Sequence, residues 1–420
     1  MRTDSVKKDE SRKVGTKRDK SHRAAAKKGA VETCMGLRGM MGAALLALLL
    51  LSILLTGCGR KEEEAAATVA QTESTTTAPI VIQRESTEAQ TEPETEGEPE
   101  GIQLLDLSDR KAVDGKVRSY LTGGWVDEAV GNRRPVATMM SNDKESLPQY
   151  GINRAGVVYE ANVEGTMNRY MAIIEDYDDL ERIGSTRSCR TYYTYFAREF
   201  DAIYSHYGQS TFAVPYLKNV DNINGIDGIG GTAFYRSSDR KAPHNAYTSG
   251  DRLKKAIETL GYSTEYDPDY HGHYQFAAET YDLGDIPEAV DAVRVLPGYV
   301  MNQPAFVYDE TDGLYHRYQY NDVHKGDEGP IAVKNLIIQY CQTGHYASTA
   351  YLNINVHTSG ENGYFFTNGK GIPILWEKDG EFGVTHYYGP DGEEIVLNQG
   401  KTWVCIVSAV DKDKLEIYGE

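Results

Sequence analysis

The stretch VVYEANVEGTMNRYMAIIEDY at residues 157–177 decides the fold. Its first part, residues 157–164, is rich in the β-branched and aromatic side chains that favour strands. Gly165-Thr166-Met167-Asn168 can turn the chain, and residues 169–177 have the same strand character. The stretch therefore predicts a β-hairpin, and the neighbouring segments can be placed around it.

Three segments flank this hairpin. Residues 133–140 (RRPVATMM) predict an earlier strand that ends at Ser141-Asn142. After the hairpin, Ser185 or Thr186 is the expected N-cap of a helix over residues 187–200, because its aromatic residues recur with helical spacing. Residues 202–207 then return to strand character.

A second helix follows Thr248 or Ser249, either of which can cap it. Leu253, Ala256, Ile257 and Leu260 share one face of this helix, and Gly261 stands at the position after its end where glycine is common. Alternating strands and helices up to this point indicate an α+β or α/β domain, which we place at residues 102–289.

From residue 290 onward the pattern is all strand, which predicts a smaller β-rich domain at residues 290–420. Turn residues such as Asn368-Gly369 and Asp391-Gly392 separate its strands. The strands are expected at residues 305–308, 314–318, 332–340, 363–366, 372–376 and 402–410.

The N-terminal part contains a targeting signal. Leu55-Thr56-Gly57-Cys58 closes an apolar run over residues 43–55. A basic residue, a short apolar core and this ending predict a bacterial lipoprotein signal peptide at residues 35–57, with acyl chains such as palmitate on Cys58. The alternative is an uncleaved transmembrane helix, but 16 mostly apolar residues from Met40 to Leu55 fall short of the roughly 20 needed.

Composition separates a tether from a body. Residues 1–34 are expected to be disordered or a mis-assigned start. Residues 58–101 hold 11 Glu against 3 Lys and Arg and few apolar residues, which predicts a disordered acidic linker. The body at residues 102–420 has a net charge of −17. So acidic a body argues against nucleic-acid binding, and the Cys58 acyl chains, rather than charge, are expected to hold it at the extracytoplasmic side of the cell membrane.

The body contains three cysteines, Cys189, Cys341 and Cys405, and none lies in a CxxC motif. This number and spacing predict small buried residues rather than a disulfide framework or a zinc cluster. We expect neither a metal nor a cofactor.

A set of short motifs runs in order along the body: RRPVA at 133–137, PQYG at 148–151, VVYEANVEG at 157–165, HYGQS at 206–210, APHNAYTS at 242–249, VKNLIIQ at 333–339 and NQGKTW at 398–403. With these motifs the chain resembles the YerB-like lipoproteins of the DUF3048 family over roughly residues 130–420. Where that family commonly has Gly-Pro-Val-Arg-Ser-x-Arg, this chain has GSTRSCR at residues 184–190 and keeps both arginines. The resemblance implies a two-domain lipoprotein and supplies no established activity.

Arg187 and Arg190 are the leading candidates for a binding site. They lie three residues apart at the expected helix start, where free N–H groups and the helix dipole favour an anion. Together with Arg169, His206, His244 and Tyr192, they would form an anion-binding cleft. The alternative is structural, in which the two arginines pair with Glu160, Glu164 or Asp201. Glu164 and Arg169 are expected to pair across the tight turn.

Glu160, His206 and His244 are the candidates for catalysis. Glu160 and Glu164 would lie about 13 Å apart on a strand, which is too far for a paired-carboxylate mechanism. Neither histidine lies in a known catalytic motif. The primary hypothesis is therefore a lipid-anchored protein that binds an anionic cell-wall ligand or partner. The alternative is a hydrolase or transferase acting on cell-wall polymers, so whether the protein is an enzyme stays open.

Overall fold

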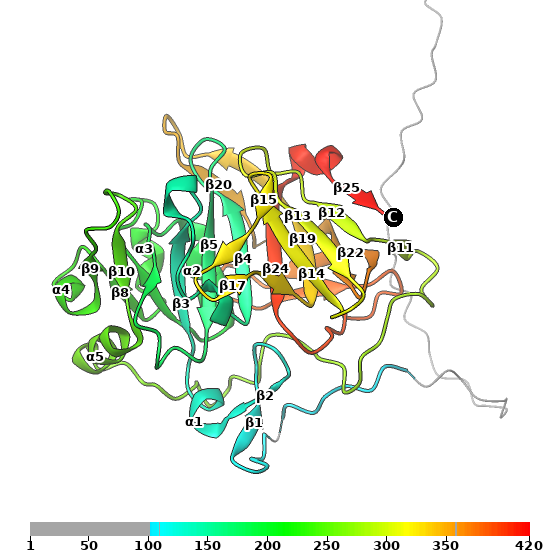
Figure 1. The fold of residues 1–420 in the computed structure, drawn as a ribbon, viewed down its shortest axis with the longest axis horizontal. Helices are drawn as coiled ribbons and strands as arrows, with labels where there is room; N and C mark the ends of the chain where they lie inside the picture. The colour runs from blue at the N-terminus through cyan, green and yellow to red at the C-terminus, as the bar shows by residue number, and fades with distance from the viewer. Residues whose placement is uncertain (1–100, 109, 358) are drawn as a thin grey trace, which may run out of the picture. The chain divides into compact units, whose positions relative to one another are not determined.

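The computed structural model describes residues 101–108, 110–357 and 359–420. The expected signal peptide, Cys58 and the tether lie outside these residues. The described chain is mostly β-structure arranged around one large sheet (Figure 1). Its ten-strand path runs β11-β22-β21-β19-β24-β4-β5-β3-β7-β8, with β20 paired to β19 and β23 paired to β22.

The bounds of these twelve strands are β3 Val136–Ser141, β4 Val157–Asn162, β5 Asn168–Ile174, β7 Ile203–His206, β8 Asn222–Asn224, β11 Val290–Asp291, β19 Asn335–His345, β20 Leu352–Asn355, β21 Ser359–Thr367, β22 Lys370–Lys378, β23 Thr385–Tyr388 and β24 Thr402–Ser408. A second sheet has six strands: β12 Arg294–Leu296, β13 Ala305–Asp309, β14 Leu314–Gln319, β15 Asp322–Val323, β18 Ala332–Val333 and β25 Glu416–Tyr418.

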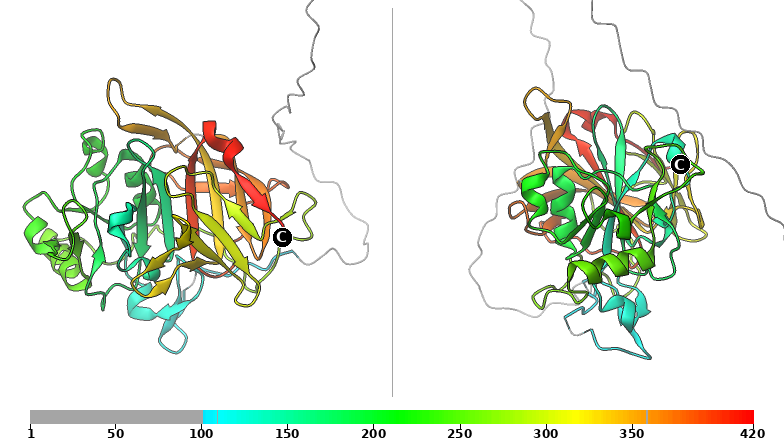
Figure 2. Two further views of the ribbon diagram at one scale, coloured as in Figure 1. Left: turned by 45° about the horizontal axis from the view of Figure 1, so that its top comes forward. Right: turned by 90° about the vertical axis from the view of Figure 1, so that its left-hand side faces the viewer.

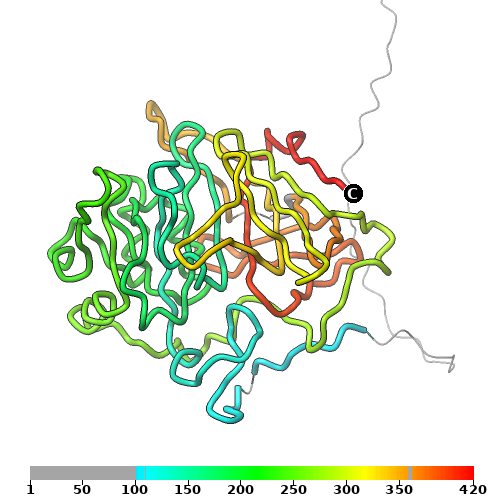
Figure 3. The backbone as a smooth tube through the Cα atoms, viewed as in Figure 1, coloured from blue at the N-terminus to red at the C-terminus, as the bar shows by residue number. Residues whose placement is uncertain are grey.

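Smaller elements complete the described chain. The short strands are β1 Lys116–Arg118, β2 Trp125–Asp127, β6 Ile183–Gly184, β9 Tyr235–Arg236, β10 Ala246–Thr248, β16 Lys325–Gly326 and β17 Gly329–Pro330. The helices are α1 Glu128–Gly131, α2 Thr191–Glu199, α3 Val214–Leu217, α4 Gly230–Ala233 and α5 Gly250–Leu260, with 3₁₀ turns at Lys144–Ser146, Ile152–Arg154 and Ala409–Lys414. Figure 3 shows residues 101–131, in cyan, running along one side of the body.

The predicted hairpin is confirmed. β4 and β5 pair antiparallel from Val157 opposite Ile173 to Asn162 opposite Asn168. Both strands are almost entirely buried, because their alternating side chains enter two cores on opposite faces of the sheet. Tyr159 packs with α2 residues in one core, and Val158 packs with α5 and six-stranded-sheet residues in the other.

Strand β24 joins the two predicted domains within one sheet. It pairs in parallel with β4 on one edge and with β19 on the other. Figure 2 shows the large sheet continuing from the segment before residue 289, in green, into the later strands, in yellow to red. The later segment is β-rich, as expected. The α+β or α/β expectation for residues 102–289 holds only loosely, since α1, α3 and α4 are four residues each.

Helix α5 follows its sequence signals closely. Ser249 is the N-cap and its hydroxyl accepts a hydrogen bond from the N–H of Arg252, while Gly261 ends the helix at φ 70°. Leu253 is buried with its two neighbours on the predicted face, but Leu260 is exposed at the helix end.

Two strand predictions need correction. The strand expected over residues 332–340 is divided into β18 and β19, because β18 pairs with β14 whereas β19 pairs with β21 and β24. The strand expected over residues 402–410 ends at Ser408, where a 3₁₀ turn begins. The three body cysteines are free and buried, as predicted.

Candidate anion-binding site

The segment that carries Arg187 lies between the ends of two parallel strands. β3 and β7 pair in parallel through Thr138 and Ser205 and then separate. Beyond that point, the Arg187 N–H donates to the carbonyl of Met139 (3.1 Å), and the Arg187 carbonyl accepts from the N–H of Tyr207 (3.0 Å). Arg187 is therefore held at the carboxyl ends of two parallel strands, the place where α/β sheets commonly bind ligands.

This pairing corrects the predicted helix start. Because the carbonyls of Arg187 and Cys189 accept from the N–H groups of Tyr207 and Ser210, they are not available to the N–H groups of a helix that begins at residue 187. Helix α2 begins at Thr191, and Arg190, rather than Ser185 or Thr186, is its N-cap. Arg187 and Arg190 thus do not share a helix face.

Arg190 is committed to other protein groups. Its Nη2 donates to Oε2 of Glu164 (2.6 Å), and its Nε donates to Oε1 of the same carboxylate. Nη1 donates to the Cys189 carbonyl (2.8 Å), and the ring of Tyr351 lies 5.2 Å from the guanidinium carbon. Burial opposes ionisation of Glu164, but its hydrogen bond with Arg190 prevails and lowers its pKa. This geometry therefore matches the structural alternative, in which Arg190 pairs with Glu164.

Arg169 lies in the same group of charges. Its Nη1 donates to the Ser188 carbonyl (2.7 Å), and its Nη2 lies 4.0 Å from Glu164, in agreement with the pair predicted across the turn. Burial, followed by the positive charges of Arg190 and Arg187, lowers the pKa of Arg169 to about 10. The three arginines are thus close enough to repel one another.

Arg187 is the least committed of the three. Its Nη1 donates to the Pro243 carbonyl (3.2 Å), whereas its Nε is buried and has no hydrogen-bond partner among the described residues. Burial and the nearby Arg190 lower its pKa, although Asp143 opposes them. An anion beside Arg187 would supply the opposite charge that compensates the buried guanidinium and offsets its repulsion from Arg190.

Other buried polar groups, in the segments at residues 141–143 and 185–187, also lack hydrogen-bond partners within the described chain. They are Nδ2 and Oδ1 of Asn142, Oγ of Ser185 and Oγ1 of Thr186. The Ser141 N–H donates to the Ser185 carbonyl (3.0 Å), so these segments run side by side. Buried polar atoms without partners are costly and commonly mark places where water or a ligand binds.

His244 lies beside this group through its loop, because Arg187 donates to the preceding Pro243. Its Nδ1 is 3.4 Å from Oδ2 of Asp143, without hydrogen-bond geometry. The same carboxylate accepts from the Ser141 hydroxyl (2.6 Å). The side chains of His244 and Asp143 are 18% and 20% exposed, so both are partly accessible to solvent.

The other predicted site residues are enclosed. His206 is buried, its ring nitrogens lie 2.9 Å from the Gly208 carbonyl and 3.2 Å from Oδ1 of Asn222, and burial lowers its pKa. Tyr192 is buried, donates to the Asn162 carbonyl, and has its pKa raised by burial.

Glu160 is also enclosed, and four donors surround its carboxylate. Oε2 accepts from Arg317 (2.8 Å) and Trp403 (3.0 Å), and Oε1 accepts from Asn168 and Asn302 (2.8 Å each). These bonds fill the carboxylate and connect it to neither His206 nor His244. The structure thus gathers Arg169, Arg187, Arg190 and His244 and leaves Glu160 in a separate buried network.

Sequence reasoning missed Asn142 as a candidate and did not consider Asp143. A signal was present, because both follow directly after a predicted strand, where residues at the carboxyl edge of a sheet are found. Their proximity to residues 185–187 depends on a pairing that the sequence pattern does not indicate.

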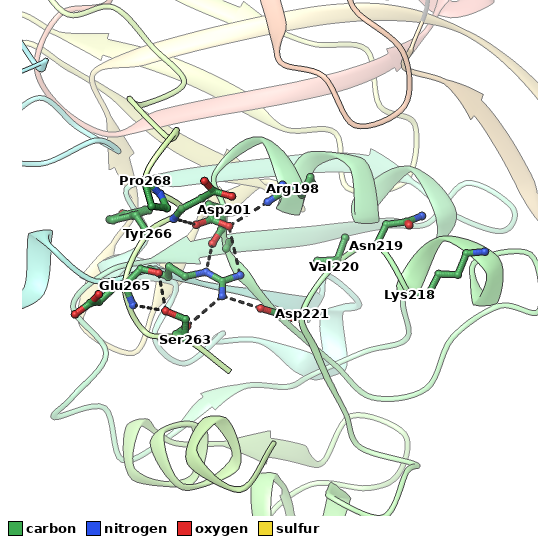
Figure 4. Close-up of a pocket in the computed structure, with 13 residues that line it drawn as sticks. Arg198, Asp201, Lys218, Asn219, Val220, Asp221, Ser263, Glu265, Tyr266 and Pro268 are labelled. Carbon is green, nitrogen blue, oxygen red and sulfur yellow. Dashed lines mark hydrogen bonds and ion pairs between the residues drawn. The ribbon is translucent and has the colours of Figure 1, made fainter. Parts of the chain in front are cut away.

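The hollow in Figure 4 lies at the opposite ends of these strands. It has a volume of about 410 Å³ and is lined by residues that precede β3, β7 and β8. Arg134 donates there to Asp221 (2.7 Å), to the Asp201 carbonyl (2.7 Å) and to the Ser263 carbonyl (3.1 Å). Asp201 also accepts from Arg198 (3.1 Å). Since these charges neutralise one another, the charged residues of this hollow are better explained as structural ion pairs than as a binding site.

Two further places on the described chain are weaker candidates for a binding site. A hollow of about 560 Å³ lies between Arg294 and Glu416 and includes exposed Val300. Asp309, Asp312 and His316 could each offer one metal-ligand atom within 4.8 Å of the others. Both aspartates are exposed and His316 is already 2.8 Å from Asp312, so nothing in this group requires an ion.

The fold and the site define the class of protein. It is a mostly β protein with a cluster of arginines at the carboxyl ends of two parallel strands, β3 and β7, of its large sheet. In the described part of the chain, no helix has the length and apolar character needed to cross a membrane. Two family models match, the N-terminal domain of DUF3048, a protein of unknown function, at residues 121–263 and its C-terminal domain at residues 295–404. The chain belongs to this YerB-like family.

The comparisons with individual proteins agree. The chain is 31% identical over 304 residues to "Putative lipoprotein YerB" of Bacillus subtilis (strain 168), covering 70% of this chain and 88% of the relative. It is also similar to the crystal structure of the YerB protein from Bacillus subtilis, with a TM-score of 0.63 and 29% identity. That similarity covers 72% of this chain and 99% of the solved chain.

Proposed function

We propose that this protein is a lipid-anchored component of the cell envelope that binds an anionic ligand at Arg187. The observation that carries the proposal is the guanidinium of Arg187, whose buried Nε has no partner within the described chain. Arg190 and Arg169 add positive charge nearby, and Glu164 offsets only part of it. In a body with a net charge of −17, such a concentration of positive charge favours an anion locally.

The anchoring part of the proposal rests on sequence. Leu55-Thr56-Gly57-Cys58 has the form of a lipoprotein cleavage site, and the curated relative bears a lipoprotein name. The acidic residues 59–101 would then give the body a reach of roughly 35–40 Å from the membrane. Envelope ligands that carry phosphate or carboxylate groups would lie within this zone.

The alternative, a hydrolase or transferase acting on cell-wall polymers, has less support. Glu160 and His206 are buried and bonded to other groups, so neither is available to a substrate. Of the three catalytic candidates, His244 is the one with a partly exposed side chain.

A binding experiment tests the proposed site. Purified protein would be titrated with pyrophosphate, and its sedimentation with isolated cell walls would be measured. Arg187→Gln should weaken both by about tenfold or more, because a charge-assisted contact contributes about 1.5–3 kcal/mol. Arg294→Gln is the matched control, since Arg294 is exposed and lies in the second hollow. Equal binding by both variants would exclude Arg187 as the site.

A fractionation experiment tests the anchor. Cys58→Ala should move the protein from the membrane pellet to the soluble fraction, because the acyl chains can no longer be attached. If the variant stays in the pellet after a high-salt wash, the apolar run at residues 43–55 is acting as a transmembrane helix instead.

A further inference from the structure

We propose that the anion held at Arg187 is a phosphate monoester, bound jointly by Arg187 and His244. This inference rests on the proposed anion-binding function and names the ligand class of that site. It follows from how the two side chains are held, which of their atoms are free, and the charge that surrounds them.

The loop that carries His244 is fixed against Arg187. Nη1 of Arg187 donates to the carbonyl of Pro243 (3.2 Å), directly before His244. The His244 N–H donates to the Lys241 carbonyl (2.9 Å), and the Tyr247 hydroxyl donates to the His244 carbonyl (3.2 Å). The guanidinium of Arg187 and the backbone at His244 are thus held by one connected group of hydrogen bonds.

The atoms left free are suited to a ligand. Nε and Nη2 form the edge of Arg187 that can bind two oxygens at once, and neither bonds to another described residue. Nε2 of His244 likewise bonds to no described residue, while Nδ1 faces Asp143 at 3.4 Å. A protonated His244 would therefore pair with Asp143 through one nitrogen and donate to a ligand through the other.

The number of donors favours phosphate over carboxylate. A carboxylate has two oxygens and one charge, which one arginine edge satisfies. A phosphate monoester has three terminal oxygens and a charge of about −1.5 to −2 at pH 7, so it gains from a second cationic donor. Nδ2 of Asn142 and Oγ of Ser185 are further donors without partners among the described residues of the adjoining segments.

The surrounding charge leads to the same ligand class. Asp143 faces His244, Arg187 adjoins it through Pro243, and Glu164 pairs with Arg190 and Arg169. Three arginines and two carboxylates leave one positive charge when His244 is neutral and two when it is protonated. A doubly charged phosphate ester matches the second state.

The test compares two small probes, methyl phosphate and acetate, by calorimetric titration at pH 6 and pH 8. At pH 6, methyl phosphate should bind at least about tenfold more tightly than acetate. His244→Gln should weaken methyl phosphate binding about tenfold at pH 6 and by less at pH 8, because a larger fraction of any imidazole carries a proton at the lower pH. The same variant should leave acetate binding within about twofold at both pH values.

Two control variants make each outcome decisive. Arg187→Gln should abolish binding of both probes, whereas Arg294→Gln should change neither. If acetate binds as tightly as methyl phosphate, or if His244→Gln weakens both equally, the ligand class is wrong while the anion-binding function stands. If neither probe binds to the unaltered protein, both proposals fail. Circular dichroism of each variant checks that it is folded.

Discussion

Nη2 of Arg317 lies 2.8 Å from Oε2 of Glu160, and neither side chain is exposed to solvent. Glu160 belongs to β4 of the large sheet, and Arg317 belongs to β14 of the six-stranded sheet. His324 accepts a hydrogen bond from Nη1 of the same arginine (2.7 Å) and bonds to Gln149 (2.9 Å). The buried pair therefore links the two sheets and also explains why Glu160 is unsuited to catalysis.

Removing the charge of Glu160 should destabilise the whole described body. In Glu160→Gln, the amide NH₂ would face donors, and Arg317 would keep a buried charge without a counterion. The expected loss in the free energy of unfolding is about 3–5 kcal/mol, measured by guanidinium denaturation. The control is Glu328→Gln, which breaks an exposed pair with Arg154 and should cost less than about 1 kcal/mol. Similar losses in the two variants would contradict a linking role.

His324 should make stability depend on pH. Burial, and then the positive Arg317, hold the pKa of His324 well below its usual value of about 6.5. Below pH 6.5 the imidazole of His324 binds a proton in the unfolded chain but stays neutral in the folded protein. The free energy of unfolding therefore decreases as the pH falls. The stabilising contribution of neutral His324 is therefore fully present above pH 6.5. Below pH 6.5 it decreases by at most about 1.4 kcal/mol for each pH unit.

The measurement compares the unaltered protein with His324→Gln in denaturant at pH 7.5, 6.5 and 5.5. Other buried groups titrate equally in both proteins, so the difference between their unfolding free energies isolates His324. This difference should narrow as the pH falls below 6.5. A difference that stays constant across the range would show that His324 titrates alike in the folded and unfolded chains.

Helix α5 offers a local test. Ser249→Ala removes the hydroxyl that accepts from the Arg252 N–H and should lower the free energy of unfolding by about 1 kcal/mol. Ser249→Asp keeps an acceptor and should recover most of this loss. Thr259→Ala, on the exposed side of the same helix, should cost less than about 0.5 kcal/mol. Thermal or urea denaturation of the three variants gives the comparison, and a loss in Thr259→Ala equal to that in Ser249→Ala would speak against the cap.

The shared sheet predicts that residues 102–289 do not fold alone. Without β24, the hydrogen-bonding edge of β4 and the apolar side chains around it would be open to water. The fragment should show no cooperative unfolding transition and should aggregate, whereas residues 102–420 should unfold in one transition. A sharp two-state transition in the shorter fragment would mean that β4 is stable as an edge strand.

Local signals explain which parts of the fold could be predicted from sequence. The β4–β5 hairpin and α5 depend on residues close together in the chain: a glycine-containing turn, a serine cap and a terminal glycine. The parallel pairing of Trp403 with Val158 joins residues far apart in sequence, and no periodicity specifies such a partner. The continuous sheet was therefore beyond what the pattern could indicate.

The same distinction applies to the site. The sequence raised Glu164 as a partner of the arginines, which Arg190 confirms, but the expectation that Arg187 and Arg190 share a helix face was wrong. The sequence could not show that the carbonyls of Arg187 and Cys189 accept from the N–H groups of Tyr207 and Ser210, so that α2 begins only at Thr191. These non-local bonds make Arg190 the N-cap and leave Arg187 outside the helix.

The two arginines should consequently respond differently to substitution. Arg190→Gln removes two bonds to Glu164 and leaves that partly buried carboxylate with Arg169, 4.0 Å away, as its remaining counterion, so the free energy of unfolding should fall by about 1–3 kcal/mol. Arg187→Gln removes one bond to a carbonyl and relieves repulsion from Arg190, so its stability should change by less than about 1 kcal/mol. Adding Glu164→Gln to the Arg190 variant should restore part of its stability, because the carboxylate that lost its hydrogen bonds to Arg190 is then gone. Urea denaturation measures all three. If Arg187→Gln were the more destabilised variant, Arg187 would be a structural residue, and the open guanidinium edge on which the binding site depends would be excluded.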